Sequence, residues 1–250
     1  MLSMIRRYAF APSQAAQASR DKANLAPNVI IYALFATASL IFFWLKPFDF
    51  PDANAALPGK ARGLLFWFKV MLWQPPLELA WIAFLLGLTQ WLRGGKLVVR
   101  LTAAALWTAL TFVLIISYWQ KLGLGQLGFA LGCLASFALF VPAVRNFPAA
   151  ERLPVVSFML GLNALGLIML APTALAAALR SSVLFNAAQI AGGIWMIGAG
   201  ALGLRRLTGI RLARAFMAML LSMFFQIALA CALYLLGVVP KDILQALLYA

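Results

Sequence analysis

The sequence predicts an all-α integral membrane protein with about seven transmembrane helices, five being the alternative. Three observations carry this prediction. Of the 250 residues, 65% are hydrophobic and only 10% are charged, whereas a soluble domain needs roughly a quarter of charged residues to cover its surface. The apolar residues form runs close to the 20 or so residues that a helix needs to cross a bilayer. The basic residues gather in the short stretches between these runs.

The apolar runs divide the chain into an N-terminal segment over 1–28, a helical bundle over 29–239 and a short outer tail over 240–250. Spans are expected near residues 29–45, 77–92, 97–119, 122–144, 154–178, 183–204 and 212–239. Single spans must be helical, because lipid cannot satisfy the backbone of an exposed strand edge. Their continuous apolar character excludes a barrel, whose strands would alternate apolar and polar residues.

Two amphipathic stretches flank the first span. In the polar to amphipathic N-terminal segment, Met4, Ile5 and Tyr8 share a helical face beside Arg6 and Arg7. Such a helix can lie on an anionic membrane surface, and a short disordered cytoplasmic tail is the alternative.

The second stretch, 59–73, combines aromatic residues with three cations, a mixture that favours the headgroup level. We expect it to form an interfacial helix on the outer side. Pro75 and Pro76 then end it because they lack a backbone N–H. A single long helix kinked at Pro75 is the alternative.

The distribution of lysine and arginine predicts the orientation. With the N-terminus in the cytoplasm, 13 of the 20 cations fall in the N-terminal segment and three alternate loops. They are Arg6, Arg7, Arg20, Lys22, Arg93, Lys96, Arg100, Arg145, Arg152, Arg205, Arg206, Arg211 and Arg214. Cytoplasmic loops carry such an excess. We therefore expect a multi-pass protein of the cytoplasmic (inner) membrane, with Gly94, Phe147 and Gly209 inside and Ala55 and Leu124 outside.

The basic loops are expected to be tight turns between antiparallel spans. Glycine permits positive φ, so Gly94 and Gly95 allow the chain to reverse within a few residues. The cations would hold each turn at anionic headgroups or contact a protein partner. The candidate contact residues are Arg93, Lys96, Arg100, Arg205, Arg206, Arg211 and Arg214.

Glu78 is the one acidic residue inside a proposed span, one turn from its outer end. We expect it to stay hydrated near Lys69, where the helix N-terminus favours an acid. An intramembrane acid can instead mark a transport path, which makes Glu78 a possible transport-path residue. Four amides in the spans are expected to form interhelical hydrogen bonds, with a polar path as the alternative. They are Asn163, Asn186, Gln189 and Gln226.

No catalytic, cofactor-binding or metal-binding residues are expected. Histidine is absent, and the two cysteines, Cys133 and Cys231, lie in apolar runs, where cysteine behaves as a small hydrophobe. No nucleophile–base pair or phosphate-binding loop is visible. Small residues at Gly128–Gly132 and Gly192–Gly203 allow close helix packing, within the chain or in a homo-oligomer. The net charge of +14 is assigned to membrane loops, so no nucleic-acid partner is expected.

Three stretches resemble the Yip1 family of polytopic membrane proteins. The first is MIRRYAFAPSQAAQASRDK, in which a proline leads into a short polar helix; the second is the RGGK turn; the third is IWMIGAGALGLRRLTGIRLARAF, where a tryptophan-containing span ends in a basic turn. Members of the family typically have five spans, so a count of seven departs from its pattern. The resemblance implies a link to membrane trafficking and small GTPases for eukaryotic relatives, and it carries over no site residues.

Together these observations predict a non-enzymatic membrane protein that acts as a scaffold or accessory subunit. It would bind membrane lipids, a protein partner in the membrane or cytoplasm, or both. The alternative is a transporter or permease component for an apolar or amphipathic substrate.

Overall fold

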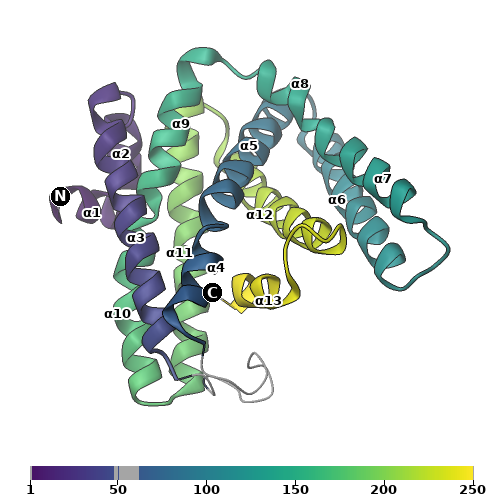
Figure 1. Ribbon diagram of the computed structural model, residues 1–250. Coiled ribbons are helices and arrows are strands. Elements are labelled where there is room, and N and C mark those ends of the chain that lie inside the picture. The colour runs from purple at the N-terminus through teal and green to yellow at the C-terminus, as the bar shows by residue number, and fades with distance from the viewer. Residues whose placement is uncertain (1, 48–49, 51–61, 250) are drawn as a thin grey trace.

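The computed structural model describes residues 2–47, 50 and 62–249, which form helices and their connections (Figure 1). Seven segments are long and apolar enough to cross a membrane. They are α3 (Leu25–Leu45), α4 (Leu64–Met71) with α5 (Gln74–Arg93), α6 (Leu97–Trp119), α7 (Gln126–Ala138) with α8 (Phe140–Arg145), α9 (Ala149–Leu162) with α10 (Ala164–Ala178), α11 (Ser182–Thr208) and α12 (Leu212–Leu235). The predicted seven-span helical membrane protein is confirmed, in place of five spans.

Several helix ends differ from the predicted spans, and left-handed residues explain three of the differences. α12 ends at Leu235 and not at 239, because Gly237 adopts a φ of +78°. α7 begins at Gln126 and not at 122, because Lys121 and Gly123 have positive φ. α11 continues to Thr208 before Gly209 caps it with a φ of +70°. A left-handed residue of this kind is a common helix stop.

Prolines interrupt two of the seven segments. α4 ends at Met71. In a continuous helix the carbonyl of Met71 would accept a hydrogen bond from the N–H of residue 75, but residue 75 is a proline and has no N–H. In the same way α7 ends at Ala138, four residues before Pro142. The helix is therefore interrupted before α5, but α4 and α5 together form one candidate span, Leu64–Arg93, as the alternative of a single kinked helix expects. Residues 59–61 lie outside the described residues, and the interfacial position of the 59–73 stretch stays a prediction.

The N-terminal segment is helical and packs on the bundle. It comprises α1 (Leu2–Phe10), α2 (Pro12–Ala18) and the 3-10 helix η1 (Lys22–Asn24). The predicted apolar face exists, but it faces protein: Tyr8 is buried and Met4 and Ile5 pack against the core. The alternative prediction of a disordered N-terminal tail is therefore wrong. At the other end α13 (Lys241–Tyr249) packs on α4, and Arg62 pairs with Asp242 at 2.9 Å.

A buried polar network fixes α1 against α3 and α9. The Tyr8 hydroxyl donates to Asn28 Oδ1 at 2.9 Å, and Asn28 Nδ2 donates to Ser157 Oγ at 2.9 Å. Burial raises the pKa of Tyr8 to about 12, although hydrogen bonds with Ser19 and Asn28 oppose the rise. The hydroxyl is therefore neutral and keeps its proton to donate.

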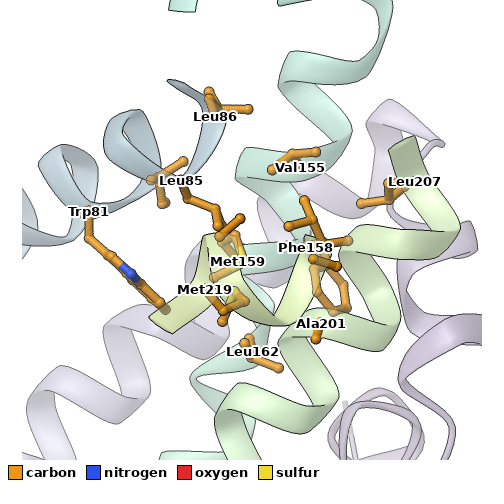
Figure 2. Packing of buried hydrophobic residues seen from close by; sticks show 14 of the residues in the cluster. Trp81, Leu85, Leu86, Val155, Phe158, Met159, Leu162, Ala201, Leu207 and Met219 are labelled. Atoms are coloured by element: carbon orange, nitrogen blue, oxygen red, sulfur yellow. The ribbon is translucent and has the colours of Figure 1, made fainter. Parts of the chain in front are cut away.

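Buried side chains of α9 and α11 pack against one another in the main hydrophobic core (Figure 2). Phe158 is fully buried, and its ring occupies the space where a Cβ on Gly203 would lie. Met219 and Leu162 lie in the same way against Gly200. Small residues on α11 thus let these side chains pack against the helix backbone, as the sequence predicts. Gly193 and Gly198 have no side chain near their Cβ positions.

α2 and the three basic turns meet at one end of the bundle, here called the basic end. Arg206 donates to Gln17 Oε1 at 2.8 Å, and Arg93 donates to the carbonyl of Thr208 at 3.0 Å. Arg93 also pairs with Glu151. These contacts join segments distant in the sequence, as the predicted alternation of loops requires.

We expect Gly203→Ala to destabilise the protein by about 1–3 kcal/mol, because the added methyl overlaps the Phe158 ring in a packed core. Gly193→Ala is the matched control on the same helix, where open space and higher helix propensity predict no loss. Thermal unfolding of the purified proteins in one detergent measures both. Equal effects of the two substitutions would contradict this account of the core.

A topology experiment tests the orientation inferred from charge. Asn146 and Ala213 at the basic end, and Leu122 at the opposite end, are exposed. Asn146 is chosen as the labelling position instead of its neighbour Phe147, because Phe147 is buried. With Cys133 and Cys231 replaced by alanine, single cysteines at Asn146 and Ala213 should resist an impermeant thiol reagent in intact cells, while Leu122→Cys reacts. Reaction at position 146 from outside would reverse the inferred orientation.

Candidate functional site

A cavity of about 310 Å³ lies inside the bundle, among α3, α4, α5, α11, α12 and the junction of α9 with α10. Ligand pockets begin at about this size. Its wall carries polar groups in an otherwise apolar bundle. The polar residues are Tyr32, Ser39, Gln74, Glu78, Asn163 and Gln226. Trp81, two phenylalanines and Ala36 of α3, and three methionines complete the lining.

Glu78 is the acidic residue of this cavity. Its side chain is buried, with the residue only 8% exposed, and Asn163 Nδ2 donates to its Oε1 at 3.2 Å. The expectation of a hydrated Glu78 near Lys69 is wrong. Because α5 begins at Gln74, Glu78 lies in its second turn on the same side as buried Leu77 and Trp81, whereas Lys69 is exposed.

Asn163 lies at the break between α9 and α10, where one helix ends and the next begins. Its amide also donates to the carbonyls of Met159 and Leu160, at 3.4 and 3.2 Å. Carbonyls in the last turn of a helix lack intrahelical partners. The same side chain therefore satisfies the helix end and holds the carboxylate of Glu78.

Two further polar groups of the cavity differ in how they are satisfied. Gln226 Nε2 donates to the carbonyl of Leu77 at 3.3 Å, across from α12 to α5. The hydroxyl of Tyr32 is buried and has no hydrogen-bond partner within the described residues. Buried polar groups in native proteins nearly always have a partner. Tyr32 thus presents an unused donor and acceptor at the same cavity as Glu78.

The predicted interhelical amides fall into two groups. Asn163 and Gln226 do form hydrogen bonds between helices, as expected. Asn186 and Gln189 are instead exposed on α11, and their side chains form no hydrogen bond within the described residues.

The sequence analysis missed Tyr32, Ser39 and Gln74 as cavity residues. The sequence pattern could have indicated two of them, because Tyr32 and Ser39 are seven residues apart on α3 and therefore lie on one face of the helix. Within the described residues, no group of three or more potential ligands among Cys, Asp and Glu is placed to hold a metal ion.

Four of the seven predicted basic contact residues bind other parts of the chain. The Arg214 guanidinium donates to the carbonyls of Leu92, Gly94 and Gly95 at the end of α5, the last two at 3.2 and 2.8 Å. Arg100 donates to the carbonyl of Trp91 and lies over its ring. These arginines satisfy carbonyls that the helix end leaves free.

Arg93 and Arg206 also have partners within the chain, in Glu151, Thr208 and Gln17. Lys96, Arg205 and Arg211 are exposed. Contact of these three with lipid or a partner stays a prediction. The carbonyls of the turns thus bind some of the predicted contact residues from within the chain.

We expect both Arg214→Lys and Arg214→Gln to lower stability, by about 1–3 kcal/mol, because a lysine cannot reach several carbonyls with one planar group. Arg211→Gln, at an exposed cation three residues earlier, is the control and should be neutral. Unfolding temperatures in one detergent compare the variants. Full stability of Arg214→Lys would show that charge alone matters at this position.

Comparison with protein-family models, curated proteins and solved structures finds no match to this chain.

Proposed function

We propose that this membrane-spanning protein binds a small amphipathic cation in the Glu78 cavity and serves as a transporter or permease component. The observation that carries the proposal is the position of Glu78, which is buried against a cavity and receives a hydrogen bond from Asn163. An ionisable residue placed inside a membrane bundle is a marker of a substrate or ion pathway.

The lining of the cavity favours a cation with an apolar part. A carboxylate taken out of water is stabilised by a positive charge or by hydrogen-bond donors, and Asn163 supplies one donor. Trp81 and the phenylalanines of α3 offer aromatic faces, which attract ammonium groups. Met71, Met196 and Met223 are flexible apolar side chains that adapt to varied shapes.

Interrupted helices support the transporter over a purely structural role. The break between α9 and α10 places Asn163 at the cavity, and the break between α4 and α5 places Met71 and Gln74 there. Transporters typically build their substrate sites from discontinuous helices, whose free backbone groups line the site.

A scaffold or accessory subunit is the second candidate. It is favoured by Asn186 and Gln189, which are exposed on α11. Amides on the surface of a membrane helix gain from hydrogen bonds with a partner helix. A non-enzymatic role, a cytoplasmic N-terminus in the inner membrane and the resemblance to the Yip1 family remain predictions under either candidate.

The proposal predicts that the purified protein binds benzylammonium saturably and that Glu78→Gln weakens binding by roughly tenfold or more, about 1.4 kcal/mol. Glutamine keeps the volume and the hydrogen bond with Asn163 and removes only the charge. Isothermal titration in detergent measures the affinity, and size-exclusion chromatography checks that the variant is folded.

Asp242→Asn is the matched control, since Asp242 lies outside the cavity on α13. It should bind as the unmodified protein does. Uptake of radiolabelled benzylammonium into proteoliposomes then separates transport from binding without flux. Unchanged affinity in Glu78→Gln would exclude Glu78 as the cation site and promote the scaffold.

A further inference from the structure

A second hollow, of about 530 Å³, lies on α1 and the start of α2, and none of its lining residues belongs to the Glu78 cavity. Its polar lining is formed by Ser3, Arg6, Arg7 and Gln14, and Leu2 and Phe10 are among its apolar residues. We propose that this hollow binds the phosphate headgroup of an anionic phospholipid.

The two guanidinium groups of the hollow are available. Arg6 and Arg7 are exposed, and neither guanidinium group has a hydrogen bond or an ion pair within the described residues. Arg93 and Arg214, by contrast, have partners in the chain. Arginine stays charged in proteins, so two adjacent unpaired guanidinium groups favour an anionic occupant.

The hollow is held in place by the inner face of α1. Tyr8 and Ala9 are buried; Tyr8 donates to Asn28, and the carbonyl of Ala9 accepts a hydrogen bond from Trp195 Nε1 at 3.2 Å. With this face fixed, Arg6 and Arg7 must point outward. The backbone that carries the two arginines is therefore fixed before a ligand binds, which lowers the entropy lost on binding.

The chemistry of the lining matches a phosphate. Guanidinium, hydroxyl and amide groups all donate hydrogen bonds, and guanidinium forms paired hydrogen bonds with phosphate oxygens. The hollow contains no acidic side chain. An anion is thus favoured by charge and by geometry.

The apolar lining and the position of α1 select a lipid over a soluble anion. Leu2 is 84% exposed and Phe10 76% exposed, at the two ends of α1. α1 packs along α9 and α10, on the flank of the bundle (Figure 1), where lipid is the neighbour of a membrane-spanning protein. Acyl chains can cover the two apolar side chains while the headgroup meets Arg6 and Arg7.

The test measures lipid retention by the full chain with native mass spectrometry, in mixed phosphatidylglycerol and phosphatidylcholine. The unmodified protein should retain phosphatidylglycerol preferentially. The double variant Arg6→Gln/Arg7→Gln should lose this retention roughly tenfold, and Arg6→Lys/Arg7→Lys should keep part of it. Lys121→Gln/Lys241→Gln removes the same charge from exposed positions that are not among the predicted contact residues and should retain lipid as the unmodified protein does.

Three outcomes would overturn the proposal: full retention in Arg6→Gln/Arg7→Gln, equal loss in the Lys121→Gln/Lys241→Gln control, or equal retention of phosphatidylcholine. Competition by millimolar inorganic phosphate would assign the hollow to a soluble anion instead. Binding of benzylammonium should be the same in all these variants, so that failure here is distinguishable from failure of the Glu78 site.

Discussion

The packing of Phe158 against the backbone of Gly203 is the contact on which the bundle depends. The absence of a side chain at Gly203 lets the buried ring of α9 reach the surface of α11. The centroid of the Phe158 ring lies 5.6 Å from that of the Tyr8 ring, and this contact holds α1 against the same part of α9. The preceding residue, Ser157, accepts the hydrogen bond from Asn28 of α3. Two adjacent residues of α9 thus position three other elements.

The cavity follows from this packing and from the helix breaks. α9 ends at Leu162, shortly after Phe158, and Asn163 then meets Glu78 across from α5. A continuous helix would need no side chain to satisfy its carbonyls, and it would place no free amide there. The interruption therefore creates both a local requirement for hydrogen bonds and a polar wall inside an apolar bundle.

The arginines of this protein have two physical roles. At the basic end, Arg93, Arg100 and Arg214 donate hydrogen bonds to carbonyls that helix ends leave free. The positive charges that favour one side of the membrane therefore also stabilise the conformation of the turns. On α1, Arg6 and Arg7 point away from the chain. Arginine thus binds within the chain where free backbone carbonyls lie within reach, and it is available to an external anion where they do not.

The sequence by itself determined the helical membrane class, the seven spans and the gathering of the basic turns at one end, because run length and charge order are properties along the chain. It also indicated the proline break before α5 and the apolar face of α1. Only the tertiary structure decided that Glu78 faces Asn163 in a cavity, that Met4, Ile5 and Tyr8 face protein, and that Arg214 binds the end of α5. The rotation of each helix about its axis, and the neighbour it meets, depend on how all the helices pack together, and in a nearly uniformly apolar helix the residue pattern leaves that rotation open.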